Sequence, residues 1–495
     1  MARSDGSSAA LKGRAGRGSS DVDGYLLGVP SRLMMPRLVF GVTVVVLLCL
    51  GLLMIFSASS VTDLTSADYG YDAAYHLKRQ LIFIAMGLAV SAFVVAGDYH
   101  LFCERLLVPI WVATVVALLI TRFAGSTTYG ATRWIQIGAF TLQPSEFAKV
   151  TIILTAANLL QKYEQDCTID LNQLALGTLV GVVVPVGLIL LQPDKGTTAI
   201  IVCTLLCMGL LSGLFSPRAF VLFLLTAIAL LAAYSLSDDY SRERIMTMVD
   251  PTRDPLDTGY QLMQSFYAFG SGGLLGVGIG NSTQKYSYLP MAHNDMIFAV
   301  IGEELGLVGT VFVIALFVAL VISGIQIARH APDLEGRLIA AGSSVLLGVQ
   351  MLVNTLGVIG FMPLTGKPLP FISYGGSSVI ACLLIAAFVL SVSRNSALPE
   401  TAHDRARRSM VMMDGGDGDV GEATPRSARR QTARTTSAGE GTRRNLTVHE
   451  GGNSSGASRS SARSDARATR NANGTTRINL GPSAADRLRG SRRDD

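Results

Sequence analysis

Long apolar runs alternate with short polar segments through most of this chain. A helix needs about 17–25 mostly apolar residues to cross a bilayer. Ten runs approach or reach that length, near residues 38–57, 80–96, 106–121, 145–161, 173–191, 197–215, 219–235, 296–327, 337–360 and 372–393. The pattern therefore predicts an all-α polytopic membrane protein with about ten transmembrane helices, whose membrane domain covers residues 37–395.

The two flanking regions lack an apolar period. Residues 1–36 are rich in Ser, Gly and Arg, and residues 396–495 in Arg, Ser, Gly, Thr and Ala, so we expect both to be disordered. An even number of spans puts both tails on one side, and their arginines favour the cytoplasm. The arginines of the longer tail are equally consistent with binding to anionic lipid or a partner and with a tail that is simply solvated. We do not expect nucleic acid as a partner.

With this orientation, one extracytoplasmic connection, residues 236–295, is far longer than the others. Loops longer than ~12–15 residues are commonly functional or disordered. This loop contains several aromatic residues and a glycine series at 270–280, which together indicate an ordered loop at the membrane interface. The glycines lack the strand, the helix and the Lys-Ser/Thr pair of a nucleotide-binding loop, so we exclude that function.

Composition agrees with a membrane protein, since 49% of the residues are hydrophobic and only 16% are charged. The six cysteines show neither a disulfide framework nor zinc spacing.

Candidate chemistry lies at the end of the long loop. His293 and Asp295 come directly before an apolar run that contains Glu304. A carboxylate inside a membrane costs about 2.5–3.5 kcal/mol on insertion scales, so these acids need partners or a function. Asp295 is also a candidate for an ordinary helix N-cap ahead of Met296, and position alone leaves both interpretations open.

A second polar stretch precedes the fourth span. Arg133 and Trp134 suit the headgroup level, where Arg offers a forked donor to phosphate. Pro144 with Glu146 in the first turn predicts a helix start. Glu146 and Lys149 share a helix face and are expected to neutralise each other. For Glu146 we favour a structural ion pair. For Lys149 a contact with substrate phosphate is as plausible as the ion pair.

Two more stretches carry charged or hydroxyl groups. Asp194 lies in a connection of a few residues, where a tight turn explains the neighbouring Pro and Gly without chemistry. Residues 363–378 hold three prolines that prevent regular helix, which puts Lys367 in an outward vestibule and Ser373 at the outer end of the last span. Irregular backbone at this depth is tolerated only where it is buried in protein or lines a cavity.

Four stretches together resemble the SEDS family (shape, elongation, division and sporulation), which are polytopic peptidoglycan glycosyltransferases. They read QPSEFAK, QPD-x-G, HND-x-IFAVIGEELG and LPFISYGGSS, in this order, within residues 38–393. The third stretch and the long polar tail are most similar to the division branch of the family. The resemblance implies polymerisation of lipid II, a disaccharide-pentapeptide on undecaprenyl pyrophosphate, at the outer face of the bacterial cytoplasmic membrane and at the division septum.

The resemblance also implies roles and partners. Asp295 matches the family's catalytic residue and would be the general base for the attacking sugar hydroxyl. Cations, with Mg²⁺ or Mn²⁺ as a possible addition, would meet the pyrophosphate charge. The expected substrate-binding residues are Arg133, Trp134, Lys149, His293, Lys367 and Ser373, supported by Glu146, Asp194 and Glu304. The implied partners are a class B penicillin-binding transpeptidase and other division proteins.

Two alternatives stay open. A lipid II flippase predicts charges through the depth of several spans, whereas the charges here gather toward the outer side. A scaffold that only recruits division proteins leaves that polar cluster unexplained.

Overall fold

The computed structural model describes residues 25–26 and 29–396, except 129–130, 138–139, 238, 254–257 and 287, and two strands at 466–470 and 476–480. The chain divides into two units, Met1–Met413 and Asp414–Asp495. The predicted disorder of the tails lies largely outside the described residues. Within the second unit, β6 (Ala466–Arg470) pairs antiparallel with β7 (Thr476–Leu480), a hairpin that the sequence analysis did not expect.

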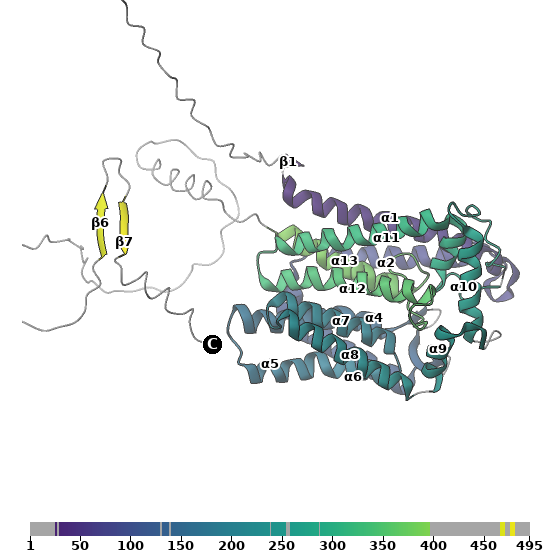
Figure 1. The fold of residues 1–495 in the computed structure, drawn as a ribbon, viewed down its shortest axis with the longest axis horizontal. Helices are drawn as coiled ribbons and strands as arrows, with labels where there is room; N and C mark the ends of the chain where they lie inside the picture. Colours follow the sequence, from purple (N-terminus) through teal and green to yellow (C-terminus); the bar gives the residue numbers. More distant parts are fainter. Residues whose placement is uncertain are drawn as a thin grey trace, which may run out of the picture. The chain divides into compact units, whose positions relative to one another are not determined.

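All ten predicted spans coincide with helical segments of the first unit (Figure 1). They are α1 (Ser31–Thr65), α2 (Tyr75–Ala96), α3 (Leu107–Ala124), α4 (Pro144–Leu160), α5 to α6 (Leu171–Thr178, η4 Leu179–Val183, Val184–Leu191), α7 (Lys195–Ser212), α8 (Pro217–Leu236), α11 (Ile297–Arg329), α12 (Leu334–Val358) and α13 (Gly376–Asn395). Among the described residues, eight helices are long and apolar enough to cross a membrane, and α3 is a shorter apolar helix. The prediction of an all-α polytopic membrane protein is confirmed.

The connections also contain regular structure. The short elements near the N-terminus and between spans are β1 (Tyr25–Leu26), β2 (Val29–Pro30), η1 (Ala67–Tyr69), η2 (Leu101–Arg105), β3 (Ser126–Thr128), β4 (Ala131–Ile137), β5 (Phe140–Leu142) and η3 (Gln161–Gln165). Strands β3, β4 and β5 form one antiparallel sheet. The long loop holds α9 (Asp239–Val249), η5 (Pro251–Arg253) and α10 (Thr258–Gly272), so its predicted order is confirmed.

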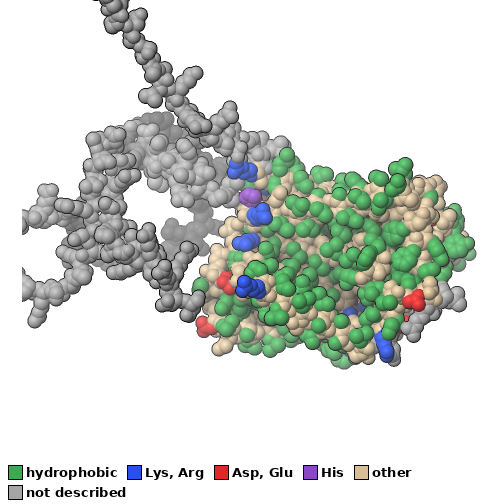
Figure 2. Space-filling model, viewed as in Figure 1, with side chains coloured by type: hydrophobic (Ala, Val, Ile, Leu, Met, Phe, Trp, Pro, Cys, Tyr) green, Lys and Arg blue, Asp and Glu red, His purple; other side chains and the backbone are tan. Residues whose placement is uncertain are grey.

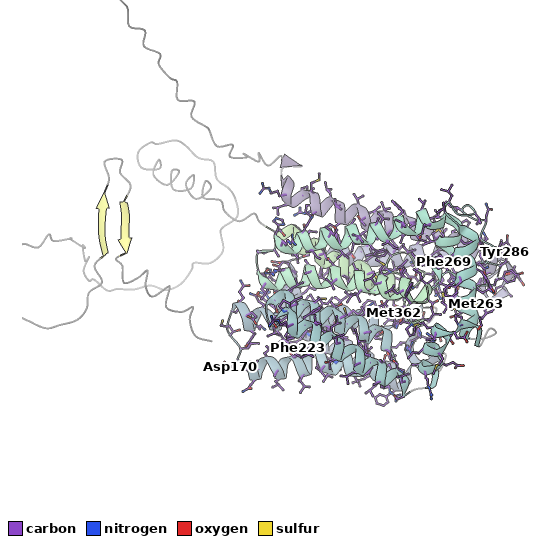
Figure 3. The ribbon with its side chains drawn as sticks, viewed as in Figure 1. Asp170, Phe223, Met263, Phe269, Tyr286 and Met362 are labelled. Carbon is purple, nitrogen blue, oxygen red and sulfur yellow. The ribbon has the colours of Figure 1, made fainter. Side chains whose placement is uncertain are left out.

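Helices far apart in the sequence pack side by side in the bundle. α13 packs on α2, α11 on α1, and α12 on α7, while α12 also packs on its neighbour in the chain, α11. The surface between the two ends of the bundle is mostly apolar, and charged side chains gather at the ends (Figure 2). Met263, Phe269, Tyr286 and Met362 lie at one end, here called the loop end, and Asp170 lies at the opposite end (Figure 3).

The glycine series of the long loop fits against a break in α11. Gly306 has a φ of 66°, and a Cβ there would lie 2.3 Å from the Gly276 nitrogen, so only glycine is accommodated. The fully buried Glu303 accepts hydrogen bonds from the Thr283 backbone N–H at 2.9 Å and the Thr283 hydroxyl at 2.7 Å. These contacts hold the glycine-rich loop against the bundle.

Helix α8 is the least embedded of the long helices. It packs against α7 and α9, and none of its residues is buried within the protein. In a bilayer its side chains would therefore meet lipid on most sides.

Candidate functional site

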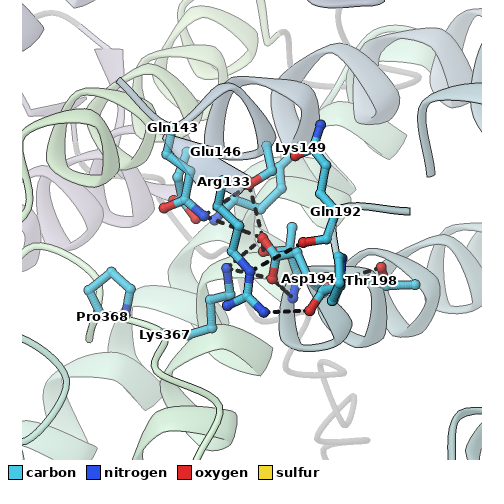
Figure 4. A network of polar contacts seen from close by, with 12 residues as sticks. Arg133, Gln143, Glu146, Lys149, Gln192, Asp194, Thr198, Lys367 and Pro368 are labelled. Atoms are coloured by element: carbon cyan, nitrogen blue, oxygen red, sulfur yellow. Dashed lines mark hydrogen bonds and ion pairs between the residues drawn. The ribbon is translucent and has the colours of Figure 1, made fainter. Parts of the chain in front are cut away.

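A buried ion pair lies at the centre of a polar network at the loop end (Figure 4). Lys367 Nζ lies 2.8 Å from the Asp194 carboxylate, and both side chains are at most 3% exposed. Asp194 also caps α7 by accepting from the Thr197 N–H at 3.2 Å and receives a hydrogen bond from the Ser145 hydroxyl at 3.0 Å. Burial alone raises the pKa of Asp194, but the charges of Lys367 and Arg133 outweigh this effect and lower it. The carboxylate is therefore ionised and structural.

Arg133 approaches the same network from β4. Its guanidinium donates to the backbone carbonyls of Gln192 and Pro193, in the turn that leads to Asp194. Arg133 and its neighbour Trp134 are both partly exposed, so each retains a face toward solvent or substrate.

The predicted contact between Glu146 and Lys149 is present deep in the bundle. Lys149 Nζ donates to Glu146 Oε2 and to Gln350 Oε1, both at 2.7 Å, and both charged side chains are fully buried. The ammonium group already has two strong acceptors, which favours the structural interpretation of Lys149. A direct phosphate contact of Lys149 stays a prediction.

Asp295 lies in a turn before α11, and its interpretation as an N-cap is wrong. The helix begins at Ile297, its N-cap residue is Met296, and no side chain caps it. The reason is that the first turn is closed by the Met296 carbonyl, which accepts from the Ala299 N–H at 3.0 Å. Asp295 Oδ1 is buried and has no hydrogen-bond partner among the described residues. Burial raises the pKa of this carboxyl, and a hydrogen bond from its own backbone N–H and the nearby charge of Arg244 only partly oppose that effect.

One amide group links the Asp295 turn to Lys367. Asn354 of α12 donates from Nδ2 to the carbonyls of Asp295 and Lys367, both at 2.8 Å. Gly366 lies beside Asp295, since a Cβ on it would be 3.6 Å from Asp295 Oδ2. Gln350, one turn before Asn354, donates to the Pro368 carbonyl at 3.0 Å. One face of α12 therefore holds the backbone of Asp295, the candidate base, and of Lys367, the candidate cation.

His293 belongs to an aromatic cluster beside this turn. Its ring centroid is 4.5 Å from that of His76, whose Nδ1 lies 2.5 Å from the buried Asp63. The His293 carbonyl accepts from the Tyr374 N–H at 2.9 Å. Burial and the neighbouring His76 lower the pKa of His293 to about 4, so its ring is neutral at pH 7.

The other two predicted residues make local contacts. Ser373 is 4% exposed, and its hydroxyl accepts from the Leu369 N–H at 2.7 Å in the turn before α13. That turn delays the start of α13 to Gly376, four residues later than the apolar run predicts. Glu304 accepts from the Ser57 hydroxyl at 2.6 Å, which ties α11 to α1, and its Oε2 has no partner among the described residues.

Several side chains of the candidate site have oxygens without a hydrogen-bond partner among the described residues. Besides Asp295 Oδ1, the side-chain oxygens of Asn294 and Asn354 are buried without a hydrogen-bond partner among the described residues. Carboxylate and amide oxygens are hard donors of the kind that Mg²⁺ and Mn²⁺ prefer, so the chemistry of these donors is compatible with the possible cation, which stays a prediction. A cluster of metal-binding residue types, His100, Asp333 and Glu335, lies beyond the other end of α11, away from Asp295.

Sequence reasoning missed Asn354, Gln350 and the Asp63–His76 pair. Asn354 and Gln350 are four residues apart within an apolar run, and this spacing puts them on one helix face. Two amides on one face of a membrane span indicate a polar partner inside the bundle, so a signal was present. Asp63 is in the last turn of α1 and His76 in the first turn of α2, and their spacing of thirteen residues gives no such signal.

The fold and the site define a class of protein. It is a multi-pass membrane protein with the partly buried carboxylate of Asp295 and the buried ammonium group of Lys367 at one end of its helix bundle. The family model of the FtsW, RodA and SpoVE cell cycle proteins matches residues 37–398. Stage V sporulation protein E of Bacillus subtilis is 37% identical over 365 residues, which are 73% of this chain and 98% of that protein. A probable peptidoglycan glycosyltransferase FtsW of Trichlorobacter lovleyi is 37% identical over 386 residues, which are 77% of this chain and 99% of that protein.

Solved structures are also similar. One is a chain from a study of the structural coordination of polymerization and crosslinking by a peptidoglycan synthase complex, with a TM-score of 0.55 and 30% identity over 70% of this chain and 96% of that chain. Another is the rod shape determining protein RodA of Thermus thermophilus, with a TM-score of 0.53 and 27% identity over 73% of this chain and 97% of that chain.

The chain therefore belongs to the FtsW/RodA/SpoVE family, which is the SEDS family of the sequence analysis. It is a multi-pass membrane enzyme of the glycosyltransferase type.

Proposed function

We propose that this protein polymerises lipid II into glycan strands at the outer face of the cytoplasmic membrane during cell division, with Asp295 as the general base. Both tails would lie in the cytoplasm and the loop end would face outward. The observation that carries the proposal is the Asp295 side chain, whose carboxyl has a raised pKa through burial and one oxygen without a partner among the described residues. The backbone carbonyl of Asp295 shares the Asn354 amide with the backbone carbonyl of Lys367.

In this reaction a sugar hydroxyl of one chain attacks the anomeric carbon of another, and the bond to the pyrophosphate breaks. Asp295 would accept the hydroxyl proton, and a raised pKa makes it a stronger base than an exposed Asp. Lys367 and Arg133 would meet the negative charge that develops on the pyrophosphate. A divalent cation bound with the pyrophosphate would supply additional positive charge at this place.

The partner would be a class B penicillin-binding transpeptidase, together with other division proteins at the septum. This is supported by the similarity to a chain of a peptidoglycan synthase complex that couples polymerization to crosslinking. The division role is supported by the relatives named FtsW.

The test is Asp295→Asn in the full-length protein, reconstituted with lipid II and the partner transpeptidase. Asn keeps the size of the side chain but cannot accept the proton, so polymer formation should fall by about 10²–10⁴-fold. Because Asp295 does not cap α11, the thermal unfolding temperature should stay near that of the wild type. The matched control is Asp72→Asn, which removes a carboxylate with an exposed partner, Lys78, and should leave activity unchanged.

Polymer formation by Asp295→Asn at a near wild-type rate would remove Asp295 from the mechanism. Movement of fluorescent lipid II across the vesicle membrane, measured in the same preparation, would then test the flippase alternative directly.

A further inference from the structure

The side chain of Asn354 lies between two irregular segments at the loop end. It is 4% exposed and projects from the last turns of α12. Its Nδ2 group donates both hydrogens, one to the Asp295 carbonyl and one to the Lys367 carbonyl, each at 2.8 Å. Because both partners are acceptors only, the opposite amide orientation would put oxygen against oxygen, so the assignment of nitrogen and oxygen is unambiguous.

Asp295 and Lys367 both need such an anchor. Asp295 lies in a turn before α11, and Lys367 lies in the proline-containing segment before α13, so neither has the hydrogen-bond ladder of a helix or sheet. The Lys367 ammonium uses one of its three hydrogens to donate to Asp194, 2.8 Å away, and that pair fixes one end of the segment. Only Asn354, among the described residues, hydrogen-bonds to the backbone of both Asp295 and Lys367.

We propose that Asn354 is a positioning residue, which sets the place of Asp295 relative to Lys367 so that the base and the cation act on one sugar–pyrophosphate bond. This inference rests on the proposed function. A general base must come within about 2.6–3.2 Å of the proton that it accepts. A misplacement of about 1 Å costs on the order of 10²-fold in rate, whereas binding of the long apolar tail does not depend on that distance.

The inference therefore predicts a change in kcat with little change in KM. Asn354→Leu keeps the approximate size and removes both donors, and we expect kcat to fall by about 10²-fold while KM stays within about threefold. Asn354→Ser retains one donor, and its kcat should fall between those of the wild type and Asn354→Leu. If Asn354→Leu inserts poorly into the membrane, the kcat of Asn354→Ser relative to the wild type still tests the inference.

The chain offers a matched control in Asn158 of α4. This amide is 5% exposed and donates to Glu335 at 2.9 Å, near the opposite end of the bundle. Asn158→Leu removes a buried amide of the same size, so it should lower the thermal unfolding temperature about as much as Asn354→Leu but leave kcat within twofold. A purely structural role for Asn354 predicts equal kcat for the two variants.

All variants are assayed as full-length protein with lipid II and the partner transpeptidase, with Asp295→Asn alongside. If Asn354→Leu retains kcat within twofold of the wild type, or loses affinity alone, the positioning role is overturned while the proposed function stands. If Asp295→Asn polymerises normally, the proposed function itself fails, and the two results are distinguishable.

Discussion

The buried pair of Glu146 and Lys149 allows a quantitative test of how the membrane domain tolerates charge. Both side chains are fully buried, their charged atoms are 2.7 Å apart, and Gln350 supplies the third contact. Removal of one partner leaves an uncompensated buried charge, which costs about 3–5 kcal/mol. Lys149→Met and Glu146→Gln should therefore each lower the thermal unfolding temperature by roughly 6–10 °C, since about 2 °C corresponds to 1 kcal/mol in a large domain.

Two combined variants separate charge from packing. The swap Glu146→Lys with Lys149→Glu restores opposite charges at the same spacing and should recover most of the loss, and the neutral double variant Glu146→Gln with Lys149→Met should also be milder than either single change. The exposed pair Asp72–Lys78 has a similar contact distance of 2.6 Å, and its disruption should cost about 0–1 kcal/mol.

The assay is thermal unfolding in detergent, followed by polymer formation from lipid II. If the swap is as damaging as the worse single variant, the simple pairing argument is refuted. If Lys149→Met unfolds normally but makes no polymer, Lys149 contacts phosphate and our structural interpretation of it is wrong.

Three further predictions follow from other parts of the molecule. Truncation after Ser396 should leave polymer formation in vitro intact, because the tail sequence has no apolar pattern with which to pack; loss of activity would contradict this. The folded-state pKa of His293 is about 4, below the ordinary value of 6.5, so the unfolded chain binds more protons between these values and stability should fall as the pH drops from 6.5 to 4. His293→Phe should weaken that dependence in thermal unfolding scans, and an unchanged dependence would assign it to other groups. Glu303→Leu should increase hydrogen exchange around Thr283, because that segment loses its carboxylate anchor; unchanged exchange would show that the glycine-rich loop is held by its backbone contacts alone.

The spans were predictable because a membrane requires long apolar runs, and prolines mark some of their limits. α4 begins at Pro144, as its helix-start signal predicts. The site was only partly predictable. Glu146 and Lys149 are three residues apart on one helix, so their contact follows from helical geometry. Asp194 and Lys367 are 173 residues apart, and no local pattern reveals that they form a pair. Asp295 follows a cap pattern, but its helix begins one residue too late for it to act as one.

The shallow packing of α8 against the rest of the bundle has an evolutionary consequence. None of its residues is buried within the protein, so few of its side chains must fit a particular partner. Selection then acts on the apolar character and length of Pro217–Leu236 rather than on the identity of each residue. We expect this helix to accumulate exchanges among Leu, Ile, Val, Phe and Ala faster than α12, in which most positions are enclosed by neighbouring helices.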